Sequence, residues 1–315
     1  MSLLVIGSIA YDSVTTVVGS RDRALGGSAT FFSIAASYFT SVDLVAVIGD
    51  DFKCRDLEIL RRHDVGLSGL ERRPGESFRW EGVYDTNDLN KRITLDTRLN
   101  VFEEFDPVLS TKQKETEFLF LANIDPNLQL QVLEQFDVKP KFVGLDTMDF
   151  WIANKKDTLN EVVKRVDVLF VDESEVKALA GQSSVVKSAR MVLGLGPTFV
   201  VVKRGDRGVI VFGQDSVFSV PAFPVETVVD PTGAGDSFAG GFVGYLAACG
   251  YTEEYDIPRA TIFGCMMGAF AVESFSIDRL DLIKNKDIEF RFGKIVEMIG
   301  LEDLATNRCF PFVST

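Results

Sequence analysis

The stretch DPTGAGDSFAGGF, Asp230–Phe242, sets two glycines and an alanine between two aspartates and then continues in small and apolar residues. The residues before it have an extended character, whereas residues 237–248 read as a helix. Glycine needs a reason in such a place, for example a positive φ angle or the close approach of a ligand. We therefore predict a strand-to-helix turn with its glycines at the helix N-terminus. The unpaired N–H groups and the positive dipole end there attract an anion, most naturally a phosphate, and the aspartate beside it is placed to act as a base.

The composition is ordinary for a globular protein, with 46% apolar and 25% charged residues. Acidic side chains outnumber basic ones by 46 to 33, which gives a net charge of −13. An acidic chain lacks the basic face that nucleic acids and anionic membranes require, so we expect neither as a partner. The length suits one large α/β domain, residues 1–315, with a small accessory piece.

The cysteines, the N-terminus and the single histidine bear on location and chemistry. The four cysteines lie far apart without a CxxC pair, as in reduced cytoplasmic proteins. The N-terminus has no basic leader region and no later apolar run is long enough to span a bilayer, so we expect a cytoplasmic protein. His63 follows an expected surface helix and is predicted to be solvated, which argues against histidine catalysis or a histidine metal site.

Short apolar runs alternate with helical patterns along most of the chain. Near-continuous apolar strands separated by helices predict a mostly parallel sheet that is covered on both faces. Ligands of such folds bind beyond the carboxyl ends of the strands. The polar residues at these ends are Asp12, Asp50, Asn123, Asp146, Asp172, Lys203 and Asp230.

One segment breaks the alternation. Glu76–Asn100 reads as two strands around a polar turn, with no helix between them, which predicts a β-hairpin inserted into the α/β body. Together with residues 11–22, it would form a small sheet over the ligand site, a lid. A surface hairpin without a function is the alternative.

Five motifs in register resemble the ribokinase-like carbohydrate kinases of the phosphofructokinase B type. Besides DPTGAGDSFAGGF, these are VIGSIAYD, LGGSA, DESE and VVKRGDRG. The resemblance covers essentially the whole chain and implies a three-layer, doubly wound α/β fold with a β-sheet lid. It also implies transfer of the γ-phosphate of ATP to a hydroxymethyl group of a sugar or nucleoside. Lid edges in this family often pair between subunits, which makes a homodimer through the lid an expectation.

In this family the last aspartate of the GAGD run is the catalytic base, here Asp236. The amides of Gly233, Ala234 and Gly235 would form the anion hole. Phosphoryl transfer needs positioning, neutralisation of the transferring oxygens and a group to accept the alcohol proton, and this turn offers all three. The alternative for Asp236 is an ordinary cap of the helix N-terminus.

The acceptor side of the resemblance rests on residues near the N-terminus. Asp12, Gly26 and Gly27 match the substrate clamp, and the strand-end Asn123 is a further candidate for substrate binding. Phe31 stands where the family usually has an asparagine that contacts a substrate hydroxyl. Its ring would stack on a less hydroxylated substrate or, alternatively, pack in the core. Lid residues Trp80, Asn90 and Arg92 could add contacts.

The donor side comprises nucleotide and metal candidates. Lys203, Gly205, Thr232, Gly233 and Gly235 are expected to bind ATP, although a solvated strand-end lysine is an alternative for Lys203. Glu175 and Asp172 match the magnesium motif, in which the family usually has asparagine at the position of Asp172; a helix N-cap is the alternative.

Two further features complete the donor side. Asp230 and Thr232 match a monovalent-cation site for K⁺, and a purely structural strand end is the alternative for Asp230. The helix expected over Ala260–Phe275 resembles the wall of the adenine pocket, or it is simply core.

We predict an ATP- and Mg²⁺-dependent kinase of a small sugar. The alternatives are a nucleoside kinase of the same family and a non-catalytic member that binds sugars or nucleotides. A nicotinamide-dependent dehydrogenase is disfavoured because the first strand leads into GSIAYD rather than a G-x-G-x-x-G turn.

Overall fold

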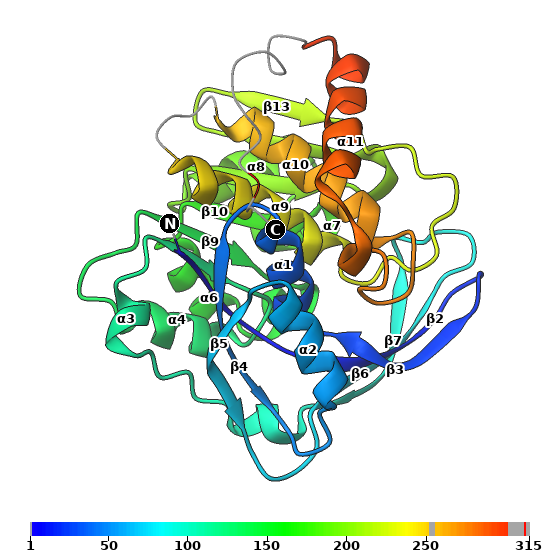
Figure 1. Cartoon of the computed structure of the whole chain (residues 1–315). Coiled ribbons are helices and arrows are strands. Elements are labelled where there is room, and N and C mark those ends of the chain that lie inside the picture. The colour runs from blue at the N-terminus through cyan, green and yellow to red at the C-terminus, as the bar shows by residue number, and fades with distance from the viewer. Residues whose placement is uncertain (1, 252–255, 302–311, 313–315) are drawn as a thin grey trace.

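A computed structural model describes residues 2–251, 256–301 and 312. Its centre is a nine-stranded sheet in the order β13-β12-β11-β10-β9-β8-β1-β4-β5 (Figure 1). All neighbouring strands from β5 through β4, β1, β8, β9 and β10 to β11 pair in parallel. At the other edge the β11–β12 and β12–β13 pairs are antiparallel, so β12 alone runs against the other strands. The strands are β1 (Ser2–Ile6), β4 (Ser41–Ile48), β5 (Gly66–Arg72), β8 (Phe118–Leu121), β9 (Phe142–Asp146), β10 (Val168–Asp172), β11 (Phe199–Lys203), β12 (Val209–Phe212) and β13 (Val217–Val220). The predicted mostly parallel sheet is confirmed.

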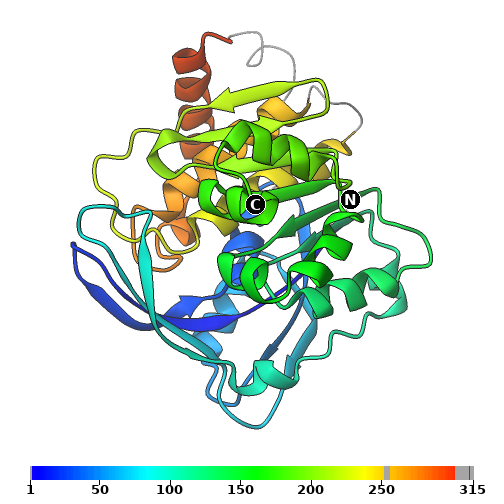
Figure 2. The same cartoon turned by 180° about the vertical axis from the view of Figure 1, so that it is seen from behind.

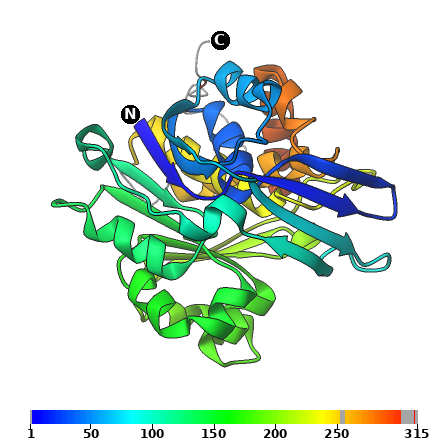
Figure 3. The ribbon, with the colours of Figure 1, turned by 90° about the horizontal axis from the view of Figure 1, so that it is seen from below.

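Helices cover both faces of this sheet, which Figure 3 shows almost edge-on. Successive residues of β1 belong to different cores: Val5 packs into one and Ile6 into the other. Strands buried on both faces need apolar side chains at every position, which explains their continuous apolar runs. The first face carries α1 (Ser28–Ser37), α2 (Cys54–Arg62), α9 (Ala234–Cys249), α10 (Asp256–Ala271) and α11 (Asn285–Ile299). The second, turned to the viewer in Figure 2, carries α4 (Pro126–Glu134), α5 (Asp149–Asn154), α6 (Lys156–Val163), α7 (Glu173–Ala180) and α8 (Val185–Leu193).

Four strands form a second, smaller sheet, the lid, in the order β3-β2-β6-β7, which extends at the lower right of Figure 1. These strands are β2 (Ala10–Thr15), β3 (Ser20–Gly26), β6 (Phe78–Tyr84) and β7 (Arg92–Arg98). The expected hairpin over residues 76–100 is β6–β7. The other half of the lid is also a hairpin and runs from residue 10 to residue 26, beyond the expected 11–22. The central β2–β6 pair is parallel.

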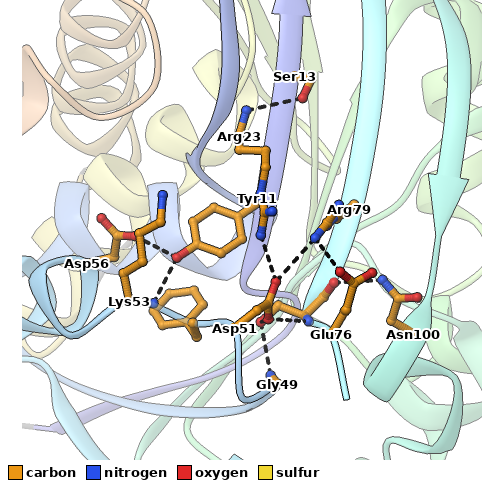
Figure 4. Close-up of polar contacts among 12 residues, drawn as sticks. Tyr11, Ser13, Arg23, Gly49, Asp51, Lys53, Asp56, Glu76, Arg79 and Asn100 are labelled. Carbon is orange, nitrogen blue, oxygen red and sulfur yellow. Dashed lines mark hydrogen bonds and ion pairs between the residues drawn. The ribbon is translucent and has the colours of Figure 1, made fainter.

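The base of the lid is tied to the body through Asp51, just beyond β4 (Figure 4). Arg23 of β3 donates to its carboxylate over 2.9 Å, and Arg79 of β6 lies 3.5 Å from the same oxygen. The Ser77 N–H donates to the other oxygen over 2.7 Å. One carboxylate therefore holds both halves of the lid against the end of a core strand.

Two expectations outside the catalytic motifs concern His63 and membrane-spanning segments. His63 is not solvated: its ring lies 3.1 Å from Ser37 Oγ and 3.2 Å from Asp281, with 11% of the side chain exposed. The pattern of α2 alone did not show that a C-terminal segment covers its end. Among residues 2–251, 256–301 and 312, no helix has the length and apolar character to cross a membrane.

Candidate active site

The glycine-rich turn directly precedes α9, and Gly233 is its decisive residue. Residues 221–233, between β13 and α9, contain no strand, so the strand expected before the turn, with Asp230 at its end, is wrong. Gly233 has φ 74°, in the left-handed region, and immediately precedes the helix. A Cβ atom added there would lie 2.3 Å from the ring of Phe31. Both the backbone angle and the space therefore require glycine. Within the described part of the chain, no side chain caps α9, although the Ala234 N–H donates to the Pro231 carbonyl over 3.2 Å. The positive dipole end and the neighbouring N–H groups of the turn remain for an anion.

Asp236 lies in the first turn of α9. Burial, and then the charge of Asp146, raise the pKa of its carboxyl to about 7, while Lys203 and Arg92 act in the opposite direction. A carboxylate with a pKa near neutrality is suited to proton transfer, because it is partly ionised yet basic enough to take a proton. A carboxyl group at this position can therefore serve as a general base.

Lys203, the last residue of β11, packs against the glycine-rich turn rather than extending into solvent. Its Nζ donates to Asp146 Oδ1 over 3.0 Å, and a Cβ on Gly235 would lie 2.9 Å from Nζ. Burial lowers the pKa of Lys203, but Asp146, Glu175 and Asp236 more than offset this and hold it above the usual value. The lysine is therefore charged and faces the place where an anion would bind.

Two of the acceptor candidates, Asp12 and Phe31, line a small pocket between lid and body. Asp12 is buried and, among the described residues, its carboxylate accepts a hydrogen bond only from the Gly27 N–H, at 3.3 Å. A Cβ on Gly26 would lie 2.0 Å from Asp12 Oδ2, so the glycine makes room for the carboxylate. Burial raises the pKa of Asp12 to about 7. The pocket is lined by Asp12, Val14, Arg21, Ala24, Leu25, Phe31, Asp230, Thr232 and Ser276.

Phe31 is 1% exposed and its ring packs on Gly233. It therefore joins the pocket wall to the anion-binding turn. Asn123 is engaged elsewhere: its side-chain oxygen accepts a hydrogen bond from Trp151 Nε1 of α5, at 3.0 Å. Trp80 packs within the lid, since a Cβ on Gly82 would lie 2.3 Å from its ring.

Asp172 and Glu175 form a reciprocal capping box at the start of α7. The Asp172 carboxylate accepts from the Glu175 N–H over 2.8 Å, and the Glu175 carboxylate accepts from the Asp172 N–H over 2.7 Å. Burial, and then the charge of Asp172, raise the pKa of Glu175 to about 8. Across the described ranges, no three Asp, Glu, His or Cys side chains group closely enough to hold a metal ion by themselves. Mg²⁺ takes few protein carboxylates and keeps its waters, so the pair fits a Mg²⁺ held mainly by phosphates.

Asp230 organises the loop before the anion-binding turn. It is 1% exposed and accepts from the Thr232 N–H over 2.9 Å and from the Ser276 N–H over 3.3 Å. Burial raises the pKa of its carboxyl. The buried Asp230 carboxylate lies between two loops and could serve as an oxygen ligand for a cation, while its two hydrogen bonds also fit the structural alternative.

Two contacts of the β6–β7 hairpin join the lid to this centre. Thr232 Oγ1 donates to Tyr84 Oη of β6 over 3.1 Å. Gly205, with φ 59°, lies under the β6–β7 turn, because a Cβ there would lie 1.8 Å from Asn90 Oδ1. The residues expected on the lid and on the nucleotide side are therefore neighbours in space.

Two residues that sequence reasoning left without a role belong to the centre. Asp146 was recognisable only as a strand-end residue, since its partner Lys203 is distant in sequence. Tyr84 ends a lid strand, and its position gave no signal of a bond to Thr232.

The comparisons place the chain in a family. The model of the pfkB family carbohydrate kinases matches residues 2–280, and the chain belongs to this family. It is accordingly a phosphotransferase with an alcohol group as acceptor. A cytidine kinase of Thermococcus kodakarensis is 30% identical over 77% of this chain and 87% of its own length. An inositol 3-kinase of Arabidopsis thaliana is 24% identical over 89% of this chain and 76% of its own length.

Solved structures show the same fold. The nucleoside kinase of Burkholderia thailandensis in complex with ADP-inosine has a TM-score of 0.77 at 17% identity, covering 94% of this chain and 96% of that one. A putative ribokinase II of E. coli in complex with ATP and Mg²⁺ also has a TM-score of 0.77, at 18% identity, over 93% of this chain and 99% of that one. The ribokinase fold with its lid, expected from the motifs, is confirmed.

Proposed function

We propose that the protein transfers the γ-phosphate of ATP to a primary hydroxyl group of a nucleoside. The observation that carries this proposal is the uncapped N-terminus of α9 with Asp236 in its first turn and Lys203 against Gly235. A small sugar, the acceptor first expected from the motifs, is the second candidate. Relatives named as cytidine and nucleoside kinases favour the nucleoside, and the apolar ring of Phe31 replaces an amide that sugars would use.

The roles follow from position and charge. Asp12 accepts a hydrogen bond from an acceptor hydroxyl in the pocket, and Asp236 takes the proton of the attacking hydroxyl. The N–H groups of Gly233 and Gly235 and the Lys203 ammonium bind phosphate oxygens. The Ala234 N–H joins them only after it leaves the Pro231 carbonyl, to which it donates over 3.2 Å in this structure. Catalysis then comes from positioning and charge neutralisation, without a covalent intermediate on the protein.

The proposed donor is ATP with Mg²⁺. Glu175 and Asp172 would hold the Mg²⁺, which would supply positive charge to the phosphates. Gly205 adjoins the nucleotide. The proposal includes K⁺ bound by Asp230 and Thr232, which would stiffen the anion-binding turn. In contrast, Asn123 has its side-chain oxygen bound to Trp151, which leaves only its amide N–H groups for a ligand.

Two proposals concern the protein in the cell. We propose a homodimer formed through the lid, supported by Ile93 and Leu95, which expose 68% and 56% of their surface on the edge strand β7. We also propose a cytoplasmic location, supported by Cys54 and Cys265, which form no disulfide within the described residues; Cys309 lies outside the described residues.

A coupled assay of ADP release tests the proposed function. The purified chain is incubated with Mg-ATP and a panel of nucleosides, pentoses, hexoses and inositols. We expect turnover with a nucleoside and a phosphorylated product that mass spectrometry identifies. Turnover only with a free sugar would replace the nucleoside by the second candidate. ATP binding without turnover on any acceptor would favour a non-catalytic binding protein.

A further inference from the structure

Two charged side chains meet above the end of β10. Asp146 ends β9 and Lys203 ends β11, so the strand between them separates the two residues in the sheet. Their side chains nonetheless join at 3.0 Å, with 6% and 20% of the respective side chains exposed. The ammonium of this pair is in contact with Gly235, on the anion-binding turn.

The pair lies in a surplus of negative charge. Asp236 is faced by Asp146 on β9, Lys203 on β11 and Arg92 on β7, and it interacts with Asp12 on β2. Lys203 is also faced by Glu175 on α7. An ammonium has three N–H donors, and within the described chain Asp146 accounts for the one hydrogen bond that Lys203 makes. Two donors therefore remain for oxygens that enter the site.

We propose that Asp146 and Lys203 are a positioning pair, in which Asp146 holds the Lys203 ammonium on the anion-binding turn so that it controls the charge of Asp236 and receives the phosphates of ATP. The proposal rests on the proposed function, because it takes Asp236 as the base and ATP as the donor. Asp146 itself touches neither substrate and acts through the lysine.

Lys203 and Asp146 have opposite effects on the pKa of Asp236. Lys203 lowers the pKa of Asp236 and Asp146 raises it. Loss of the ammonium in Lys203→Met should move the acidic limb of the kcat/KM profile to higher pH, by about one unit. Loss of the carboxylate charge in Asp146→Asn should move the same limb to lower pH. A side chain that only supported the fold would lower activity without moving the limb in opposite directions.

Loss of Lys203 and loss of the Asp146 charge should also have different effects on the binding of Mg-ATP. Lys203→Met should weaken Mg-ATP binding by about tenfold, since a hydrogen bond to a charged phosphate is lost. Asp146→Asn should leave the Kd unchanged or lower it, because one repelling carboxylate is neutralised. Its kcat should fall, because the ammonium is no longer held on the turn. Lys203→Arg keeps the charge and should keep the acidic limb near its wild-type pH.

The experiment measures both quantities on the full chain: Kd for Mg-ATP by calorimetry, and pH profiles of kcat/KM with the best acceptor of the panel. The control is the ion pair of Lys139 and Asp167, 2.7 Å apart at the amino ends of β9 and β10, changed to Lys139→Met and Asp167→Asn. Circular dichroism and thermal melting exclude misfolded variants. The control variants should change neither quantity.

The outcomes separate this proposal from the proposed function. Wild-type protein that binds Mg-ATP but phosphorylates nothing would contradict the function, while the Kd values would still decide the role of the pair. Kd values that Lys203→Met leaves unchanged, or pH limbs that shift in the same direction in both variants, would overturn the positioning pair although the kinase is active. Wild-type protein that binds no Mg-ATP would overturn both.

Discussion

Asp236 is the residue on which the proposed chemistry depends most directly. Asp236→Asn keeps the shape of the side chain but cannot take a proton, so kcat should fall by about 10²–10⁴-fold, the scale of general-base catalysis. The Kd for Mg-ATP should change little. The control is Asp157→Asn, which alters an exposed aspartate in the first turn of α6. A variant with near wild-type kcat would show that Asp236 is not the base.

Gly233 makes a second residue-scale prediction, on stability. Gly233→Ala places a Cβ at φ 74° and 2.3 Å from the ring of Phe31. The backbone angle alone costs about 1–2 kcal/mol for a residue with a Cβ, and the crowded ring adds to it. Chemical denaturation should therefore show a loss of unfolding free energy of about 2–4 kcal/mol.

The matched control for Gly233 is Gly181, the C-cap of α7. It has φ 65° and no atom within 4 Å of an added Cβ, so Gly181→Ala isolates the cost of the backbone angle. Equal losses in the two variants would mean that Phe31 moves aside at no cost, and the tight contact would then carry no energy.

Single residues also show which features of the site could be predicted from the sequence and which could not. Lys203 and Asp236 could be assigned to one edge of the sheet, because a strand end and a glycine-rich turn are local patterns. Asp12 was expected to end the first strand, but it lies within β2 of the lid. The contacts of Lys203 with Asp146 and of Phe31 with Gly233 could not be predicted, because they depend on the order of strands and on how far side chains reach. The capping box of Asp172 and Glu175 was visible as an alternative, since its spacing is local.

At the scale of elements, the start of α9 is tied to the segment after α10. Asp230 reaches the Thr232 N–H on one side and the Ser276 N–H on the other, so a cation bound there would join the two. We expect activity to rise about 3- to 30-fold when K⁺ replaces a large organic cation at equal ionic strength, because the bound ion favours the competent geometry of the turn.

The variant Asp230→Asn tests this site while it keeps an acceptor for the loop. It should remove the difference between the two cations, as measured by initial rates with Mg-ATP. Rates that do not depend on the monovalent cation in wild-type protein would leave Asp230 with a structural role only.

The lid was predictable as an element but not in its details. A break in the strand–helix alternation marked β6–β7, whereas the partner hairpin β2–β3 reached beyond its expected end. The contacts of Tyr84 with Thr232 and of Asn90 with Gly205 arise only when the lid lies over the body, which no local pattern encodes.

At the scale of the whole molecule, the edge strand of the lid predicts self-association. Ile93 and Leu95 alternate along β7 and expose their apolar side chains on one face, and an open edge strand pairs readily with another. Light scattering after size exclusion should give the mass of a dimer, and Ile93→Lys should give a monomer. The control is Val186→Lys, at a residue 55% exposed on α8. A monomeric wild-type protein would contradict the proposal.

The buried carboxyl groups predict how global stability depends on pH. Burial raises the pKa of Asp12 and Asp236 to about 7 and that of Glu175 to about 8. A group with a raised folded-state pKa contributes stability below its unfolded-state pKa, and this is lost as the pH rises through the folded value. The melting temperature should therefore fall between pH 6.5 and pH 8.5.

His63 affects stability in the opposite direction, because burial lowers its pKa. Its contribution to the pH dependence of the melting temperature lies mainly below pH 6.5. Melting curves by calorimetry measure the slope, and Asp236→Asn should make it shallower because one of the three groups no longer titrates. A melting temperature that rises over this interval would contradict the raised pKa values.

The contact between Phe31 and Gly233 limits how this enzyme could acquire a new acceptor. A change at position 31 would alter the pocket wall and would also alter the support of the turn beneath the transferring phosphate. Selectivity and turnover are therefore not independent at this position. Val14 and Arg21 line the same pocket from the lid strands β2 and β3. An engineer who wants a different acceptor should randomise those two lid positions first and leave the phenyl ring in place.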